Sequence, residues 1–449
     1  MTTNQAGRIA FRAERAFVDG EFRPTTIVVE DGMIAALDRP PPPGVPVVEV
    51  PSSAVLLPGL VDTHVHINEP GRTAWEGFAT ATAAAAAAGT TTVLDMPLNS
   101  IPPTTTPDAL ATKRAATNGK LAVDVGFWGG AVPENLGALA PLVEAGVFGV
   151  KAFLSPSGVA EFGHLDPGQL RQALAEVAAL GSRCIVHAED PELLVTHEAL
   201  GPRYADFLAT RPAASEASAI ALVIAGVETT GARAHIVHVA DAGSLDLVRA
   251  VRSAGLPLTT ETCPHYLTLA ADEIPDSSPE FKCCPPIRTR TNQDGLWAGV
   301  LDGSIDAIVS DHSPSTVEQK HCGGGDFGLS WGGIAGLQTS FAATWTEARS
   351  RGIRLEQLLP LFTTGPAAIA GLDDRLGRIT PGSPAHLVVF RPEERWTVDA
   401  AQLQHRNPIS PWDGRELFGL VETTYLRGEP VWSAADGLLD RRGRMLSAQ

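Results

Sequence analysis

The chain has 449 residues, of which 44% are hydrophobic and 19% charged, a composition typical of a soluble globular enzyme with one large and one smaller domain. Its formal net charge is −17, and no cluster of lysine and arginine interrupts the acidic balance, which argues against nucleic acid and anionic membranes as partners. The five cysteines include no Cys-x-x-Cys pair and the N-terminus has no apolar signal core, so we expect free thiols and a cytoplasmic protein.

The N-terminal segment is rich in predicted strands. Apolar stretches meet at Asp19-Gly20 and at Asp31-Gly32, and both pairs are typical of hairpin turns. A proline-rich segment, 40–46, ends this part of the chain. After Pro58 the pattern changes, because short apolar strands now alternate with longer helical segments, as in βα units around a parallel sheet.

Eight strand candidates follow, and eight βα units over about 300 residues predict a (β/α)8 barrel that spans residues 58–375. Between the first two strands we expect a helix from Trp75 to Ala88, ended by Gly89, a residue suited to helix C-termini. The strand candidates lie near residues 61–67, 91–96, 122–127, 148–154, 184–187, 234–239, 256–260 and 306–310.

The chain becomes β-like again after the predicted barrel. Segments 386–390 and 423–426 are apolar or β-branched and are bounded by turn residues. Strands that flank a barrel at the two ends of one chain are expected to pair with each other. We therefore predict an α/β protein in which residues 1–57 and 376–449 form one small β-sandwich domain.

Polar residues at the strand ends carry the functional prediction. His64 and His66 lie two apart in the first predicted strand, so both imidazoles point to the same side, an arrangement suited to a metal ion. Further candidate ligands end the fourth, fifth, sixth and eighth strands: Lys151, His187, His238 and Asp311. Taken singly, each has a structural explanation, such as a helix cap for the aspartate. Six of them at the functional end of one barrel favour a single shared site.

Lys151 is the unusual member of this set, because an ammonium group cannot ligate a cation. A buried lysine loses its proton readily, and the neutral amine can react with carbon dioxide to give a carbamate. The carbamate has two oxygens and a negative charge, so it can bridge two metal ions. The sequence therefore predicts a carboxylated Lys151 between two divalent ions, which together generate hydroxide at neutral pH.

The motifs around these residues resemble those of the amidohydrolase superfamily, in its cyclic-amidase branch of hydantoinases, dihydroorotases and allantoinases. The resemblance covers essentially the whole chain and is strongest to allantoinases. It implies a metal-dependent hydrolase of purine catabolism that opens a cyclic amide and forms a homotetramer. The motifs that carry it lie at residues 58–72, 95–104, 150–155, 261–267 and 310–314.

The resemblance also implies a role for each ligand. Asp311 is in addition the catalytic residue, which takes a proton from the attacking hydroxide and delivers it to the departing ring nitrogen. Zinc is the metal that we expect, with iron, cobalt, nickel and manganese as alternatives that the ligands also suit. Three residues hold one ion, two hold the other and one bridges them: His64, His66 and Asp311; His187 and His238; carboxylated Lys151.

One position indicates which ring is opened. Dihydroorotases of this branch carry an arginine for the substrate carboxylate two residues after the second histidine, and this chain has Asn68 there. An amide suits an uncharged ring, so we expect allantoin as the substrate, with Asn68, Asn99 and Ser313 as candidate contacts. Loop capping explains these three residues equally well. Hydantoinase, dihydropyrimidinase or dihydroorotase activity is the alternative, and the complete ligand set disfavours a non-catalytic scaffold.

Two features stay open at this stage. Cys284 replaces the serine or asparagine that related enzymes carry before Pro-Pro, and a thiol is a poor donor, so substrate contact there is through backbone or absent. The glycine-rich loop 321–328 is either a mobile lid over the site or a plain surface loop.

Overall fold

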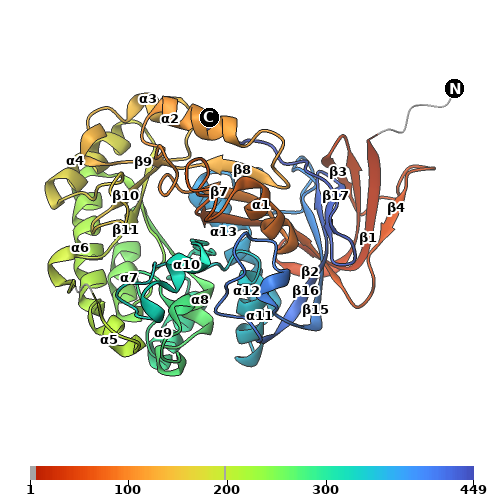
Figure 1. The fold of residues 1–449 in the computed structure, drawn as a ribbon. Coiled ribbons are helices and arrows are strands. Elements are labelled where there is room, and N and C mark those ends of the chain that lie inside the picture. Colours follow the sequence, from red (N-terminus) through yellow and green to blue (C-terminus); the bar gives the residue numbers. More distant parts are fainter. Residues whose placement is uncertain (1–6, 197–198, 449) are drawn as a thin grey trace.

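The computed structural model describes residues 7–196 and 199–448. It contains a barrel of alternating strands and helices, with a layer of long strands on one side (Figure 1). The middle of the chain builds the barrel, whereas the layer contains strands from both ends. The predicted fold class, a (β/α)8 barrel with a β domain made by both termini, is confirmed.

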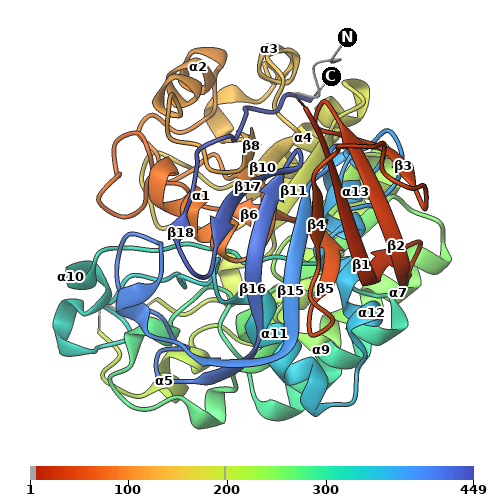
Figure 2. The ribbon, with the colours of Figure 1, turned by 90° about the vertical axis from the view of Figure 1, so that its right-hand side faces the viewer.

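The terminal strands form one nine-stranded sheet in the order β18-β17-β16-β15-β5-β1-β2-β3, with β4 beside β1 (Figure 2). The rings of Phe11 on β1 and Tyr425 on β16 lie 4.9 Å apart. Two strands separate β1 from β16 in the sheet, so the sheet folds back on itself like a sandwich. Its strands are β1 (Arg8–Val18), β2 (Glu21–Glu30), β3 (Met33–Leu37), β4 (Val47–Glu49), β5 (Val55–Pro58), β15 (Leu387–Thr397), β16 (Glu416–Leu426), β17 (Glu429–Ser433) and β18 (Gly437–Leu438).

The eight predicted barrel strands are found close to their predicted positions. They pair in parallel, and the short β9 (Gly129–Gly130) continues β8 and pairs with β10. The barrel closes where Val65 bridges His312 and the amide of His66 donates to the His312 carbonyl at 2.8 Å. The strands are β6 (Leu60–Val65), β7 (Thr90–Asp95), β8 (Asp124–Phe127), β10 (Val150–Phe153), β11 (Arg183–His187), β12 (Arg233–Ile236), β13 (Leu258–Thr262) and β14 (Ala307–Ile308).

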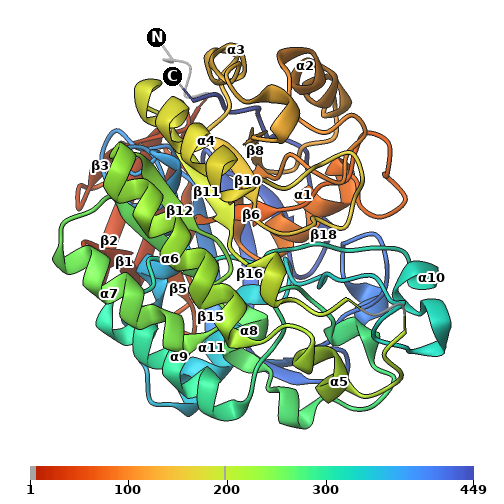
Figure 3. The ribbon, with the colours of Figure 1, turned by 90° about the vertical axis from the view of Figure 1, so that its left-hand side faces the viewer.

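The helices cover the outside of the barrel, and α4, α6, α7 and α9 lie on the side away from the terminal sheet (Figure 3). The helix expected from Trp75 begins only at Phe78, because Trp75 lies in a turn where its ring packs 4.7 Å from that of Trp331. The helices are α1 (Phe78–Ala87), α2 (Pro107–Ala116), α3 (Ala140–Glu144), α4 (Pro167–Ala179), α5 (Tyr204–Ala209), α6 (Ala213–Thr230), α7 (Leu245–Ser253), α8 (Pro264–Thr268), α9 (Arg290–Asp302), α10 (Val317–Lys320), α11 (Ser340–Ser350), α12 (Leu355–Leu358) and α13 (Thr364–Ala370).

One helical stretch, Tyr204–Thr230, has the length and hydropathy of a membrane span. In the structure it consists of two helices, α5 and α6, interrupted before Pro212, which has no amide donor for a continuous helix. The buried face of α6 includes Ile220, Val223 and Val227, which belong to the barrel core. The stretch is therefore part of the barrel wall.

The end of the chain returns to the barrel, where residues 443–448 run beside β8. Asp124, the first residue of β8, joins three parts of the molecule. Its carboxylate lies 2.7 Å from Nη1 of Arg427, which follows β16, and 3.3 Å from Nε2 of His386, which precedes β15. It also accepts a hydrogen bond of 2.8 Å from the amide of Arg444. The exact domain boundaries, 1–57 and 376–449 against 58–375, stay a prediction.

Asp124 should contribute strongly to stability. Burial raises the pKa of its carboxyl group, but the hydrogen bond from His386 and the charge of Arg427 outweigh burial and lower it. The stabilisation is therefore complete at neutral pH and is lost as the pH falls through this lowered pKa. We expect Asp124→Asn to lower the free energy of unfolding by about 3 kcal/mol at neutral pH, with a smaller loss in acid.

Urea unfolding of the two proteins at several pH values measures this loss. The matched control is Glu416→Gln, which breaks an exposed ion pair of 3.1 Å with Arg395 and should change stability by less than about 1 kcal/mol. Equal effects of the two substitutions would contradict the prediction for Asp124.

Candidate metal centre

The six residues predicted from the strand ends lie on the wall of one cavity of about 730 Å³. The backbone is strained at two of them, since φ is 41° at His238 and 43° at Asp311, values that are uncommon outside glycine and cluster at functional sites. Lys151 lies within β10, and the other five lie near or after the ends of β6, β11, β12 and β14: His64, His66, His187, His238 and Asp311.

His64, His66 and Asp311 form the first group of possible ligands. Oδ1 of Asp311 lies 3.2 Å from Nε2 of His64 and 3.5 Å from Nε2 of His66. Burial is the main cause that lowers the pKa of both histidines, so both rings are neutral and have a lone pair to donate. Two imidazole nitrogens and a carboxylate oxygen that converge in this way suit a divalent cation.

His187 and His238 form the second group. Nδ1 of His187 lies 2.9 Å from Nε2 of His238, while Nε2 of His187 lies 2.8 Å from Oε2 of Glu189. Two imidazole nitrogens at this distance either share a proton or face a common cation. The two groups are adjacent, because ligand atoms of His64, His238 and Asp311 all lie within 4.8 Å of one another.

Lys151 is fully buried on β10, and its Nζ has no hydrogen-bond partner among the described residues. Burial lowers the pKa of its amine to about 8, although the charges of Asp311 and Glu261 raise it, so the neutral form is accessible near neutral pH. Nε2 of His64 is equally buried and without a hydrogen bond in the described part of the chain. Buried polar atoms without partners are rare and costly, so this donor set fits a site that cations complete.

Three residues that the sequence analysis overlooked support these histidines. Oε1 of Glu261 lies 2.5 Å from Nδ1 of His64, and Arg211 forms an ion pair with Glu189. Burial raises the pKa of Glu189, but the charges of Arg211 and His187 lower it to about 2, so this carboxylate is ionised. The position of Glu189, two residues after His187, was an available signal, whereas nothing in the sequence connects Glu261 with a histidine far away in the chain.

The structure brings two of the three candidate substrate contacts to the cavity. Asn99 and Ser313 line it, but Asn68 does not. Asn68 is fully buried and its amide donates to the carbonyl of Pro314 at 3.3 Å, so it anchors the loop after the last barrel strand. The structure therefore places Asn68 outside the cavity wall, and its contact with a substrate stays a prediction.

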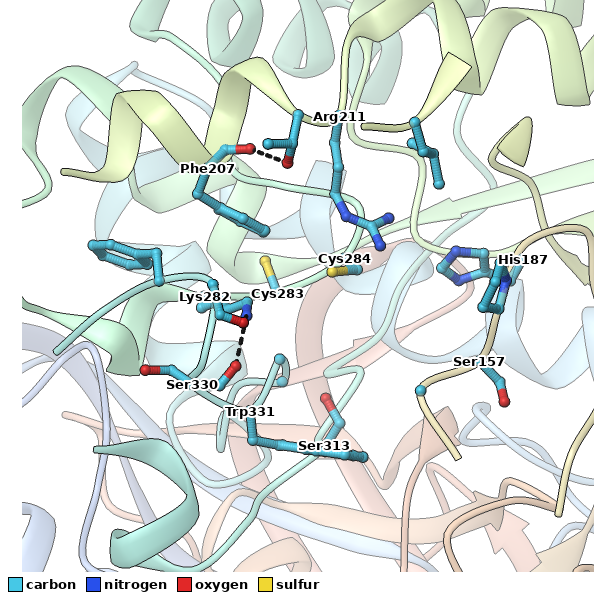
Figure 4. Close-up of a pocket in the computed structure, with 18 of the residues that line it drawn as sticks. Ser157, His187, Phe207, Arg211, Lys282, Cys283, Cys284, Ser313, Ser330 and Trp331 are labelled. Atoms are coloured by element: carbon cyan, nitrogen blue, oxygen red, sulfur yellow. Dashed lines mark hydrogen bonds between the residues drawn. The ribbon is translucent and has the colours of Figure 1, made fainter. Parts of the chain in front are cut away.

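The cavity wall also contains cationic side chains that the sequence analysis did not consider. Arg211 points toward Cys284 on the wall, and Lys282 lies nearby (Figure 4). Both charges are already engaged, because Arg211 pairs with Glu189 and the ammonium of Lys282 donates to the carbonyl of Ser330 at 2.5 Å. The cavity wall thus has positive charge from Arg211 and Lys282, although position 68 is not an arginine.

Loop 321–328 forms part of the same wall. The carboxylate of Asp326 accepts hydrogen bonds from the amides of Leu200, Gly201 and Gly328, at 3.1, 2.8 and 2.6 Å. Hydrogen bonds thus hold the loop to the segment at Leu200 and Gly201, and it is part of the cavity wall rather than a plain surface loop. Cys284 also lines the cavity.

A parallel barrel that gathers four histidines, a lysine and an aspartate around one cavity at its strand ends has the features of a metal-dependent hydrolase. The comparisons with known proteins agree with this class. Residues 55–431 match the Amidohydrolase family. The chain is 49% identical to an allantoinase of Streptomyces avermitilis over 98% of this chain and 99% of that one. It is 42% identical to an allantoinase of Saccharomyces cerevisiae over 86% and 85% of the two chains.

Solved structures show the same fold. An L-hydantoinase (dihydropyrimidinase) from Arthrobacter aurescens superposes with a TM-score of 0.91 at 28% identity and covers 98% of this chain and 100% of its own. A D-hydantoinase (dihydropyrimidinase) from Thermus sp. gives a TM-score of 0.88 at 26% identity, over 98% and 99% of the two chains. The chain belongs to the amidohydrolase family, and within that family to the allantoinases.

Proposed function

We propose that this enzyme hydrolyses allantoin to allantoate by opening the hydantoin ring at an amide bond. The observation that carries the proposal is the 49% identity to an allantoinase over nearly all of both chains. Every predicted ligand is present at one cavity in this chain, as a working hydrolase requires. The hydantoinase structures support the same chemistry, which is hydrolysis of a cyclic amide.

The residues of the cavity suit two divalent ions, for which we propose zinc, with iron, cobalt, nickel and manganese as metals that the same donors accept. When bound, such ions polarise the amide carbonyl and make hydroxide available near neutral pH. Lys151 is the residue that we propose to be carboxylated, because its amine is buried and has a lowered pKa, and a carbamate has two oxygens that would suit two ions. The ligands would be His64, His66 and Asp311 for one ion, His187 and His238 for the other, and Lys151 for both.

Asp311 is the residue that we propose to move the proton. Its carboxylate lies on the cavity wall and can accept the proton of the attacking hydroxide and pass it to the ring nitrogen as the carbon–nitrogen bond breaks. The carbonyl carbon gains an oxygen and becomes a carboxylate, and the nitrogen gains the proton. The imidazoles do not compete for this proton, because burial keeps His64 and His238 neutral.

Asn99 and Ser313 are the proposed substrate contacts. The side-chain amide of Asn99 has no hydrogen bond among the described residues and is free for the ring or the ureido tail of allantoin. The amide of Ser313 donates to the Ile334 carbonyl at 2.9 Å and its hydroxyl donates to the Asp311 carbonyl at 3.0 Å. The carbonyl of Ser313 is therefore the group left to accept a hydrogen bond from a substrate N–H.

We also propose that the enzyme acts in the cytoplasm as a homotetramer. All five cysteines are free thiols, which suits a reducing compartment. The tetramer rests on the resemblance to cyclic amidases. The only partner that the proposal requires is the small substrate.

A substrate panel tests the proposal. With metal-replete enzyme we expect kcat/KM for allantoin to exceed that for hydantoin, dihydrouracil and dihydroorotate by at least about tenfold. Dihydroorotate should be poor, because its carboxylate loses water on entering the cavity and Arg211 is already paired with Glu189. A higher kcat/KM for dihydrouracil or hydantoin would assign the enzyme to the dihydropyrimidinases or hydantoinases instead.

A further inference from the structure

Glu261 is a buried carboxylate that touches the candidate metal centre from outside the cavity. It stands on β13, is 1% exposed and does not line the cavity. Oε1 lies 2.5 Å from Nδ1 of His64, and Oε2 lies 3.0 Å from Nε2 of His235. Among the described residues no lysine or arginine forms an ion pair with it. Its two oxygens therefore each contact an imidazole, behind the position where a cation would sit.

Glu189 holds the corresponding place at the other group of histidines. It follows β11, is fully buried and is not part of the cavity wall. Oε2 lies 2.8 Å from Nε2 of His187, and Arg211 pairs with the same oxygen. Glu189 and Glu261 share no hydrogen-bond partner, so each supports a different part of the site.

The hydrogen bonds of these carboxylates decide which nitrogen of each histidine can bind metal. An ionised carboxylate only accepts hydrogen bonds, so the ring nitrogen that faces it carries the proton. A proton on Nδ1 of His64 leaves the lone pair on Nε2, the atom that lies 3.2 Å from Asp311. A proton on Nε2 of His187 leaves the lone pair on Nδ1, the atom that faces His238. Such hydrogen bonds also make the unprotonated ring nitrogen more basic and therefore a stronger metal ligand.

We propose that Glu261 and Glu189 are positioning residues that set the affinities of the two metal ions separately. Glu261 would govern the ion at His64, and Glu189 the ion at His187. The inference rests on the metal centre of the proposed function. Because the carboxylates act on different rings, removal of one leaves the other histidine in its binding tautomer. A role in stability alone would lower the melting temperature and leave both metal affinities unchanged.

Metal titration of the metal-free enzyme tests this without any substrate, with zinc as the probe and a chelator as competitor. Glu261→Leu and Glu189→Leu should each lower the affinity for one ion about 10- to 100-fold and change the affinity for the other by less than about threefold. Glutamine keeps an oxygen that accepts a hydrogen bond, so Glu261→Gln and Glu189→Gln should lose less metal affinity than the leucine variants. The matched control is Asp124→Asn, which removes a buried carboxylate that also contacts a histidine but lies outside the cavity wall. Asp124→Asn should lower stability and leave the affinity for both ions unchanged.

Ligand variants identify the ion that each carboxylate controls. In a His66→Ala background the affinity for the first ion is already low, so Glu261→Leu should lower it little further. Glu189→Leu should lower the affinity for the second ion in the same background. A His238→Ala background should give the opposite result. Non-additivity of this kind is expected only for residues that act on the same ion.

Several outcomes would overturn the inference. If either substitution lowers the affinity for both ions equally, the inference fails. It also fails if a substitution lowers stability and leaves both affinities unchanged. If the wild-type enzyme does not bind two ions, the metal centre of the proposed function fails as well. If the variants do not fold, nitrogen NMR of the histidines in the metal-free wild-type enzyme decides the matter. The expected tautomers carry the proton on Nδ1 of His64 and on Nε2 of His187, and the opposite tautomers would refute the inference.

Discussion

Replacement of Lys151 by alanine is expected to remove most of the bound metal and nearly all activity. The side chain is fully buried among four histidines whose pKa values burial, and then the charge of Lys151, lower, and burial lowers its own pKa to about 8. If it bridges two ions as a carbamate, its loss should exceed the roughly 10- to 100-fold effect typical of supporting residues. Metal analysis and kcat/KM for allantoin measure the two losses.

Chemical rescue makes the Lys151 prediction specific. Short carboxylic acids such as acetate or propionate can occupy the space of the carbamate, so they should restore part of the activity of Lys151→Ala. The matched control is His187→Ala, in which the same acids should restore nothing. Labelled bicarbonate should introduce a carbamate carbon into the wild-type enzyme. An active, metal-loaded enzyme with an unmodified Lys151 would contradict the prediction.

Asp311→Asn should lower kcat by at least about 10²-fold, the low end of the range for general acid–base catalysis. Asparagine keeps an oxygen near His64 and His66, so much of the metal should remain bound. It cannot accept the proton that must pass from the attacking hydroxide to the ring nitrogen. Metal analysis and steady-state kinetics of the same protein sample separate the two effects.

A second aspartate of the same segment provides the control. Asp306 precedes β14, pairs with Arg252 and accepts a hydrogen bond of 2.8 Å from the amide of Thr260, and it does not line the cavity. Asp306→Asn should reduce stability and leave turnover nearly unchanged. Near-normal turnover in Asp311→Asn would remove the proton-transfer role from Asp311.

The barrel and the six residues that meet at its cavity could be predicted because both depend on local pattern. Short apolar strands separated by helical segments define the topology, and the ends of parallel strands meet at one face of a barrel. His64 lies near the end of β6, His66 follows its last residue, and His187 is the last residue of β11. A strand end fixes the direction of its side chains, so no long-range contact had to be known.

Asn68 shows where this reasoning stops. It comes after the end of β6, and its side chain is turned by a hydrogen bond to Pro314, 246 residues away in the chain. The contact between Glu261 and His64 joins residues 197 positions apart. Side chains in irregular segments and buried supporting residues are placed by tertiary contacts, which no spacing rule describes. The sequence thus predicted which polar residues meet at the cavity better than which residues support them.

The pairing of β5 with β15 has a consequence for synthesis of the protein on the ribosome. All four residues of β5, Val55–Pro58, are buried in the finished sheet, and the partner strand begins only at Leu387, about 330 residues later. At 5–20 residues per second this interval lasts on the order of 15–65 s. During that time the nascent chain carries an apolar strand with an unpaired edge, the kind of edge that invites aggregation. The strands before the barrel are thus made long before β15, the strand that completes their sheet.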